Sequence, residues 1–593
     1  MSEREKLTEQ VFTGLPTAPG IAIGEIFIFR HDTPDYTEYC LINNSISDEV
    51  DRLKKAVDAS RSQLRQLYDR IQSTMGESIA RIFLVQSEVL EDADFIDDII
   101  NRIESDKLNA EAAVHYTTDF FKQQFEQLDS ELMRQKAQDI RDIGNRLIQT
   151  LLGSAGGAIK SPEKPMVLVS DDLLPSDVLH LLDGNILAIA TDLGGVASHT
   201  AILTRALDVP AVVGLKTLSK SAHSEQKIIV NGNSGKVFLN PSEENLSNYR
   251  IKQAKYRAYK KELSNLGDLP SITIDNRPVH LYANVELPQE TKAVISYGAE
   301  GIGLFRSEYL FLTHRQIPNE MEQFAEYKKV IGAIAPKVVT IRTYDLGGDK
   351  IFPELPHPVE ANPFMGWRAI RVGLDYPLFL KTQLRAILRA SAFGNVKIMF
   401  PFVSGLREIR TLMMHYAEAK QELHKEGIPY NSDVKVGIMI ELPSAVMLAD
   451  ELAREVDFFS IGTNDLAQFT LAVDRGNELV SKHFRHLHPA LLRMIKMTVD
   501  AAHRNGIDVA ICGELAASPL VTLLLTGLGL DQLSMSPAAI PEIKKIIRSI
   551  TLDEAQKFTD KCLSYDTAED LHDFCLDFMK RRFADLPIWF NGV

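Results

Sequence analysis

The sequence has few cysteines, no long apolar run and a deficit of positive charge. Its 4 cysteines in 593 residues include no C-x-x-C pair, which argues against both a disulfide framework and a structural zinc site. No apolar run approaches the length of a membrane span, and residues 1–6 lack the apolar core of a signal peptide. We therefore expect a cytoplasmic protein without membrane insertion.

The net charge limits the partners that the chain can bind. It has 65 Lys and Arg against 80 Asp and Glu, a formal net charge of -15, which disfavours nucleic acid and favours a basic protein partner. The hydrophobic fraction of 45% is typical of a folded soluble chain. At 593 residues we expect about three or four domains, because a single core rarely grows so large.

The pattern of apolar residues changes along the chain and predicts an α/β protein with several parts. Residues 14–30 are typical of strands and turns, and amphipathic helices follow to about residue 152, with Val50, Leu53 and Val57 at helical spacing. The predicted parts are an α/β domain at residues 1–40 and 153–242, a helical bundle inserted at 41–152, a helical linker at 243–268 and a barrel at 269–593.

The inserted helices carry many charged residues. Most charged helix faces are solvated surfaces that only pack against the rest of a bundle. The acidic run Glu91–Asp98 could instead contribute to docking of a partner, and the sequence leaves both interpretations open.

Short apolar runs predict the strands of the first α/β domain. The turn sequence Asn231–Gly235 between two of them is a strong hairpin signal. The runs are Met166–Ser170, Ile186–Thr191, Ala211–Val213, Lys227–Val230 and Val237–Leu239.

Eight further apolar runs, mostly separated by helical segments, follow residue 271. Eight such units over roughly 310 residues predict a (β/α)8 TIM-like barrel with insertions. The runs are Val279–Ala283, Gly301–Phe305, Val338–Ile341, Val396–Phe400, Val434–Ile440, Asp457–Ile461, Asp508–Ile511 and Gln532–Met535.

Polar side chains fall just past these runs. In a barrel such positions converge on the mouth at the carboxyl ends of the strands, where reactants bind. The alternative is that they form ion pairs that close the rim. They are Asn284, Glu286, Arg306, Glu308, Arg342, Asp345, Glu441, Asn464, Asp465, Cys512, Glu514 and Ser536.

The predicted barrel mouth combines cations with carboxylates. A guanidinium group grips two oxygens of a phosphate or carboxylate in one plane. Glu441 and Asp465 follow neighbouring strands and suit Mg²⁺, which usually takes one or two protein carboxylates with substrate oxygens and waters. Together they predict a site for a small, doubly anionic, metal-bound phosphate ester. The arginines suited to it are Arg306, Arg342, Arg368 and Arg475.

Cys512 has two interpretations. A thiol at the end of a strand is commonly a small buried hydrophobe. At the mouth of a barrel, however, its proton could go to a carbanion, because an unperturbed thiol pKa lies near 8.5 and can be tuned. The second interpretation suits a donor whose leaving group is an enolate.

His199 lies in the stretch Gly194–Arg205, after a short apolar run and a Gly-Gly turn. Ser198 is a plausible N-cap, so His199 is expected in the first turn of a helix, where unpaired N–H groups hold an anion such as a phosphate. A lone histidine more often only caps a helix. The phosphate site predicted in the second half of the chain favours a phosphoryl carrier.

Several long motifs resemble one known family. Across essentially the whole chain the sequence resembles enzyme I of the bacterial phosphoenolpyruvate:sugar phosphotransferase system. The motifs that carry the resemblance are Gly194–Arg205, Gly298–Glu308, Asp345–Lys350, Asn362–Arg368 and Asp457–Asp465.

The resemblance implies roles for the candidate residues. His199 would be phosphorylated on Nε2 by phosphoenolpyruvate and would pass the group to a histidine of the phosphocarrier protein HPr. Cys512 would protonate the enolate to give pyruvate. The helical insertion would dock HPr, the barrel would form a homodimer, and the phosphohistidine domain would swivel between its two partners. Glu441 and Asp465 would bind Mg²⁺, and phosphoenolpyruvate would be held by Arg306, Arg342, Asn464, Asp465 and Arg475.

Two competing functions stay in view. Pyruvate phosphate dikinase and phosphoenolpyruvate synthase share the mobile histidine and the barrel, but they need a nucleotide-binding domain, for which we find no glycine-rich loop. A non-catalytic regulator would bind phosphoenolpyruvate without reacting, and the presence of Cys512, Glu441 and Asp465 speaks against it. The absence of a preceding sensory domain leads us to expect the sugar pathway rather than its nitrogen-regulatory branch.

Overall fold

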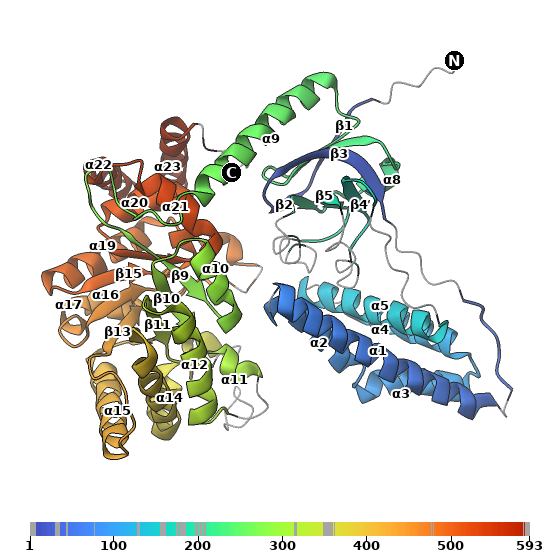
Figure 1. Ribbon diagram of the computed structural model, residues 1–593, viewed down its shortest axis with the longest axis horizontal. Helices are drawn as coiled ribbons and strands as arrows, with labels where there is room; N and C mark the ends of the chain where they lie inside the picture. Colours follow the sequence, from blue (N-terminus) through green and yellow to red (C-terminus); the bar gives the residue numbers. More distant parts are fainter. Residues whose placement is uncertain are drawn as a thin grey trace. The chain divides into compact units, whose positions relative to one another are not determined.

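The computed structural model of the chain divides into two units. The first comprises Met1–Tyr259 with Asp585–Val593, and the second comprises Lys260–Ala584 (Figure 1). The structure describes residues 8–29, 36–42, 45–75, 77–126, 131–153, 162–173, 177, 185–195, 201, 204, 209–313, 317–347, 360, 362–475, 477, 479–584 and 586.

A mixed sheet lies at the centre of the first unit. Its strands are β1 (Gln10–Thr13), β2 (Leu15–Ala18), β3 (Ile21–Ile28), β4 (Met166–Ser170), β5 (Ile186–Thr191), β6 (Ala211–Val213), β7 (Lys227–Asn231) and β8 (Lys236–Leu239). Their order is β1-β8-β7-β3-β4-β5-β6-β2, with β3 to β6 parallel and the other neighbours antiparallel. A short helix, α8 (Leu218–Ser221), precedes β7.

The predicted strands of this sheet are confirmed, with ends that agree to within two residues. The predicted turn joins β7 and β8 as an antiparallel hairpin. Gly235 has a φ of 69°, and a Cβ there would lie 2.2 Å from the carbonyl oxygen of Gly14. The turn therefore requires glycine at this position for both its conformation and its space.

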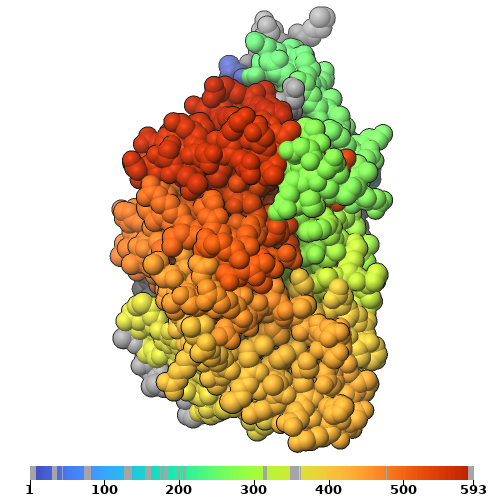
Figure 2. All heavy atoms as spheres, turned by 90° about the vertical axis from the view of Figure 1, so that its left-hand side faces the viewer, coloured from blue at the N-terminus to red at the C-terminus, as the bar shows by residue number. Residues whose placement is uncertain are grey.

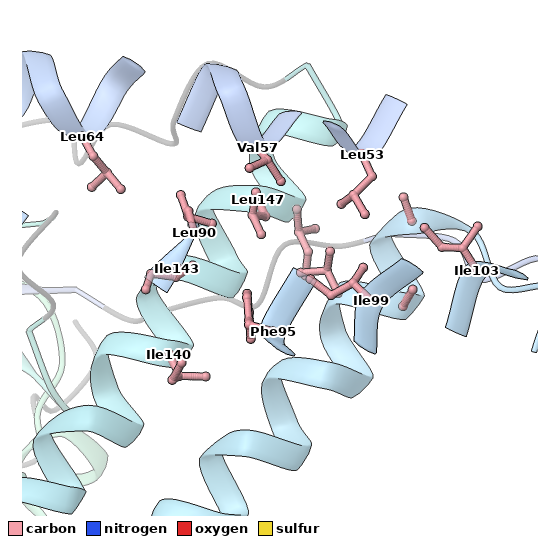
Figure 3. Close-up of a cluster of buried hydrophobic side chains, with 14 of the residues drawn as sticks. Leu53, Val57, Leu64, Leu90, Phe95, Ile99, Ile103, Ile140, Ile143 and Leu147 are labelled. Atoms are coloured by element: carbon pink, nitrogen blue, oxygen red, sulfur yellow. The ribbon is translucent and has the colours of Figure 1, made fainter. Parts of the chain in front are cut away.

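Among the residues that the structure describes, five helices lie between β3 and β4, which are hydrogen-bonded neighbours, so the predicted helical insertion is confirmed. Figure 3 shows side chains of this bundle that point toward one another, including Leu53, Ile99 and Leu147, all of them fully buried. The predicted apolar stripe therefore forms the core of the bundle. The helices are α1 (Ile46–Met75), α2 (Glu77–Val89), α3 (Ala93–Ser105), α4 (Ala110–Glu126) and α5 (Glu131–Leu151).

The acidic run before and within α3 has partners inside the bundle. Asp92 is the N-cap of α3, and its side chain accepts hydrogen bonds from backbone N–H groups of the first helical turn. The carboxylate of Asp98 accepts from Arg102 (2.8 Å) and from Thr117 (2.6 Å). These contacts give the run a structural role, and its contribution to docking stays a prediction.

The predicted helical linker is present as α9 (Glu243–Ser264). In the first unit, the ring of Tyr249 packs on Phe238 with 5.0 Å between centroids. In the second unit, the carboxylate of Glu262 pairs with Lys545 at 2.6 Å. Each end of the helix is thus fixed to its own unit, and the limits of the four predicted domains stay predictions.

The second unit is built on a closed barrel of parallel strands, as predicted. Helices cover such a sheet on the outside and side chains fill it on the inside, so its strands read as nearly continuous apolar runs. The strands are β9 (His280–Val285), β10 (Gly301–Arg306), β11 (Val338–Arg342), β12 (Val396–Phe400), β13 (Lys435–Ile440), β14 (Phe458–Ile461), β15 (Asp508–Ile511) and β16 (Gln532–Met535).

Helices surround this barrel, and Figure 2 shows the face on the side of α15, α17 and α19, in yellow-orange to orange. The helices are α10 (Thr291–Ser296), α11 (Tyr309–Thr313), α12 (Glu320–Ile334), α13 (Ile370–Asp375), α14 (Pro377–Ala390), α15 (Leu406–Lys425), α16 (Pro443–Met447), α17 (Ala449–Leu452), α18 (Thr463–Leu471), α19 (Pro489–Arg504), α20 (Thr522–Gly527), α21 (Ile540–Ile547), α22 (Leu552–Leu563) and α23 (Ala568–Arg582). Within the described part of the chain, no helix combines the length and the apolar character that crossing a membrane requires.

Candidate active site

A cavity of about 290 Å³ lies at the carboxyl ends of the barrel strands. All eight barrel residues predicted to bind or react contribute to its lining. A larger cavity of about 610 Å³, beside the start of α23, contains none of them. The smaller cavity is lined by Leu304, Arg306, Arg342, Asp345, Gly347, Phe364, Arg368, Met439, Glu441, Gly462, Asn464, Asp465, Arg475, Cys512 and Gly513.

Two of the predicted arginines, the buried Arg368 and the largely buried Arg342, are paired with carboxylates. Arg342 donates to Glu308 (3.0 Å) and lies 3.2 Å from Asp345. Arg368 donates to Asp345 (2.9 Å) and to Asp465 (3.1 Å). Burial lowers the pKa of both guanidinium groups, but the neighbouring carboxylates raise it by more, so the net pKa shift is upward and both stay charged.

The other two arginines are accessible to a ligand. Arg306 forms an ion pair with Glu286, and Arg475 lies 3.9 Å from a carboxylate oxygen of Asp465. The two arginine side chains are 42% and 44% exposed. The Arg306–Glu286 pair is weak because it is exposed, and the Arg475–Asp465 pair is weak because it is long, so both cations can exchange their partners for an anionic ligand.

Two buried carboxylates face the arginines. Burial and the charges of Asp465 and Asp345 raise the pKa of Glu441 to about 8. One oxygen of Glu441 accepts the backbone N–H of Phe402 at 2.7 Å. Asp465 Oδ1 and Asn464 Oδ1 are buried without a hydrogen-bond donor among the described residues. A hard divalent cation would stabilise these buried acids, because it would bind oxygens that accept no hydrogen bond from a described residue.

Cys512 follows β15 and is buried, with Sγ 3.6 Å from the carbonyl oxygen of Ile461. Burial raises the pKa of this thiol, so it keeps its proton at neutral pH. Leu304 and Met439 lie in the same apolar cluster and also line the cavity. A protonated thiol beside an apolar wall suits proton donation to carbon.

Three family descriptions match the chain in sequence order. "PEP-utilising enzyme, N-terminal" matches residues 13–136, "PEP-utilising enzyme, mobile domain" matches 162–235, and "PEP-utilising enzyme, PEP-binding domain" matches 260–552.

Whole-length relatives are similar as well. The chain is 39% identical over 569 residues to the phosphoenolpyruvate-protein phosphotransferase of Haemophilus influenzae, covering 96% of this chain and 99% of that protein. The protein of that name from Geobacillus stearothermophilus is 39% identical over 578 residues, with 98% and 99% covered. The one from Bacillus subtilis is 38% identical over 577 residues, with 97% and 100% covered. The chain belongs to the phosphoenolpyruvate-protein phosphotransferase family.

The family that the motifs predict is thereby confirmed, and with it phosphoryl transfer from phosphoenolpyruvate to protein as the class of reaction. The family match does not by itself assign the residues that carry out the reaction. The structure brings the barrel residues to one cavity, but His199 lies outside the described residues.

The structure describes residues 185–195, which lead into the segment that contains His199. The side chain of Asp192, just after β5, accepts hydrogen bonds from Leu218 N (2.7 Å) and from the Ser219 hydroxyl (2.6 Å). Gly194 has a φ of 105°, which glycine adopts readily. The predicted turn after β5 therefore has an anchored beginning, and the position of the imidazole stays a prediction.

Arg368 reaches the cavity although it does not follow a barrel strand. An isolated β-bridge pairs it with Gly347, whose φ is 120°. A Cβ on Gly347 would lie 2.5 Å from the Cα of Arg368, so only glycine permits this approach. Asp345, two residues earlier, accepts hydrogen bonds from the Arg368 guanidinium.

Several lining residues that are small or apolar were not predicted from the sequence. Leu304 and Met439 lie inside strands, where apolar residues give no sign of a site. Gly462 and Gly513 each follow a strand, and a glycine at a strand end was a usable signal for a close approach.

Gly462→Ala should disturb the carboxylate site. A Cβ there would lie 2.7 Å from Glu441 Oε2 and 3.0 Å from Met439 Sδ. Both neighbours are buried, so we expect the substitution to lower the free energy of unfolding of the barrel by about 1–3 kcal/mol. Denaturant unfolding followed by fluorescence measures it.

A matched control is Gly332→Ala in α12, where a Cβ meets nothing within 4 Å. Alanine is the better helix former, so this variant should be more stable by about 0.5–1 kcal/mol. Equal stability of the two variants would contradict the crowding at Gly462.

Proposed function

We propose that the chain moves the phosphoryl group of phosphoenolpyruvate to Nε2 of His199, releases pyruvate, and passes the group to a histidine of HPr in the cytoplasm, which drives sugar uptake and phosphorylation. The observation that carries the proposal is the convergence of the eight predicted barrel residues on one cavity. His199 supplies the acceptor from within the segment that matches a mobile domain.

The cavity suits the two anionic ends of phosphoenolpyruvate. Arg306 and Arg475 offer exposed guanidinium groups to the incoming ligand, and Arg342 and Arg368 hold charge deeper in the site. Asn464 also lines the cavity, and its side-chain amide donates to Glu514 at 3.4 Å. Because phosphoryl transfer depends mainly on positioning and charge neutralisation, such an arrangement supplies much of what the reaction needs.

Mg²⁺ fits the carboxylate side of the cavity. Glu441 and Asp465 would hold it, and Asp465 Oδ1 accepts no hydrogen bond from a described residue. Among the described residues, no three or more His, Cys, Asp or Glu side chains gather as a metal site, so substrate and water would provide the other ligands. When bound, Mg²⁺ would neutralise charge on the transferred phosphoryl group.

Glu441→Gln and Asp465→Asn should each weaken Mg²⁺ binding. Each change keeps the size of the side chain and replaces a carboxyl group, which can ionise to bind Mg²⁺, with a neutral amide. In the presence of phosphoenolpyruvate we expect the apparent Mg²⁺ affinity to fall on the order of 100-fold. Titration calorimetry on the full chain measures it.

Glu455→Gln is the control for these substitutions, because Glu455 pairs with Arg410 on the exposed surface of the barrel unit. Its Mg²⁺ affinity should equal that of the unchanged chain. If all three variants bind Mg²⁺ equally well, the metal assignment is wrong.

The decisive test of the reaction uses labelled phosphoenolpyruvate. With Mg²⁺ and no nucleotide, the full chain should acquire an acid-labile phosphoryl group and release pyruvate. A requirement for nucleotide would favour a dikinase-like enzyme, and binding without labelling would favour a regulator. Intact-mass spectrometry distinguishes the three results.

The inserted helices carry the surface that we propose for partner docking. Leu84 and Val85 are neighbouring apolar side chains on α2 that are 41% and 49% exposed, and Glu88 on the same helix is exposed. An apolar patch with an acidic neighbour suits a partner with an apolar patch and a basic rim. HPr is the proposed partner, and the barrel unit is proposed to form the homodimer.

His199 must move between the barrel site and HPr if it is to carry the phosphoryl group. The barrel must load the imidazole and HPr must unload it, so the two cannot occupy it together. We therefore include a swivel of the histidine-bearing domain in the proposal.

A further inference from the structure

Phe402 has a backbone conformation that a bulky residue rarely adopts. It follows β12 with a φ of 60°, in the left-handed region. There the Cβ of an L-residue crowds the neighbouring carbonyl oxygen, so single positions of this kind persist where the surrounding structure enforces them. Phe402 is 1% exposed and is absent from the cavity lining, so it acts from behind the wall of the site.

The peptide group of Phe402 is directed at Glu441. Its N–H donates to Glu441 Oε1 at 2.7 Å, and both residues are buried. The other oxygen, Oε2, lies beside Gly462, which lines the cavity. A short hydrogen bond to one oxygen fixes the plane of the carboxyl group, which sets where the second oxygen lies.

The ring of Phe402 is directed at two cations. The guanidinium carbon of Arg368 lies 4.5 Å from the ring centroid, and that of Arg371 lies 4.9 Å away. The guanidinium of Arg368 lies over the ring, while its N–H groups donate to Asp345 and Asp465. The carboxylates hold the guanidinium through its N–H groups, and the ring adds a separate contact with its carbon, so both limit where Arg368 can lie.

We propose that Phe402 is a positioning residue for the barrel site: its N–H orients Glu441 and its ring holds Arg368, so one residue sets the places of a metal-binding carboxylate and a substrate-binding cation. The inference rests on the proposed function for the roles of those two side chains. An ordinary core phenylalanine needs neither the left-handed backbone nor two arginines over its ring. Phe402 also makes an ordinary core contact, an edge contact with Phe469 at 5.7 Å between ring centroids.

Fluorinated phenylalanines test the ring without changing its shape. Ring fluorination weakens the negative face stepwise, so 4-fluoro, 3,5-difluoro and 3,4,5-trifluoro side chains at position 402 should raise the KM for phosphoenolpyruvate progressively. The complete series should change it by about 2- to 30-fold, with a smaller effect on kcat. The same residues at Phe469 are the control and should leave KM unchanged. A flat series at 402, or equal series at both positions, overturns the role of the ring.

Removal of the N–H tests the backbone. Replacing residue 402 with phenyllactic acid turns its amide into an ester that keeps the side chain and loses the donor. The apparent Mg²⁺ affinity with phosphoenolpyruvate present, measured by calorimetry on the full chain, should fall by about 10-fold or more, as for loss of a hydrogen bond to a charged group. Unchanged affinity overturns the role of the N–H.

Two further variants separate this inference from the proposed function. Arg368→Ala should weaken phosphoenolpyruvate binding, and Glu441→Gln should weaken Mg²⁺ binding. If these two have no effect, the proposed function of the site is wrong. If they act as expected and the probes at 402 do not, Phe402 is only a core residue.

Discussion

A His199→Ala chain is expected to accept no phosphoryl group from phosphoenolpyruvate and to lose turnover by more than about 10⁴-fold. Removal of a nucleophile leaves binding and charge neutralisation intact but leaves the transferred group without an acceptor. Neutral imidazole is the form that attacks, and the helix start that the sequence predicts at His199 would suit the anion that results. Intact-mass spectrometry after exposure to phosphoenolpyruvate and Mg²⁺ measures the phosphoryl group, and pyruvate release measures turnover.

His223→Ala is the matched control, because His223 is an exposed histidine in the same unit. It should be phosphorylated as fully as the unchanged chain. Labelling of the His199→Ala chain would show that another residue is the acceptor. Loss of labelling in both variants would point to unfolding, which circular dichroism detects.

The barrel could be predicted because its strands follow a simple physical rule. A strand such as Val396–Phe400 is covered on the outside by helices and packed on the inside, so it reads as an apolar run. The polar residue after each run then lies at the mouth, which is why Arg306, Glu441 and Cys512 line one cavity.

The contacts inside the cavity could not be predicted in the same way. Arg368 reaches the site through a β-bridge to Gly347, and no strand-end rule places it there. Its partners come from different elements, since Asp345 lies in the loop after β11 and Asp465 in the first turn of α18. Such pairings depend on loop conformation, which apolar periodicity does not encode.

Phe402 is another residue whose contacts could not be predicted from the sequence. Its sequence neighbourhood, an apolar run followed by Ser404-Gly405, predicts only the end of a strand. The positive φ of Phe402 and its contact with Glu441 arise from tertiary packing that overrides local preference. Residues that position other residues therefore escape a search for charged or nucleophilic side chains.

Cys512→Ala is expected to slow pyruvate formation by about 10²- to 10⁴-fold while phosphoenolpyruvate still binds, because loss of a general acid affects the step that needs the proton. Burial raises the thiol pKa, so the acid form is present at neutral pH and is lost only as the pH rises through that raised value. Turnover of the unchanged chain should therefore fall on the alkaline side. Pyruvate release and calorimetric phosphoenolpyruvate affinity, measured across pH, separate the two effects.

Stereochemistry gives the sharper readout of the same substitution. A thiol fixed by the carbonyl of Ile461 and an apolar wall delivers its proton to one face of the enolate, whereas solvent reaches both faces. Phosphoenolpyruvate that carries one hydrogen and one deuterium at defined positions of carbon 3 should, in tritiated water, give one methyl configuration with the unchanged chain and a mixture with Cys512→Ala. Cys40→Ala, at an exposed cysteine of the first unit, should keep both the rate and the single configuration. A single configuration from Cys512→Ala at full rate would assign the proton to another donor.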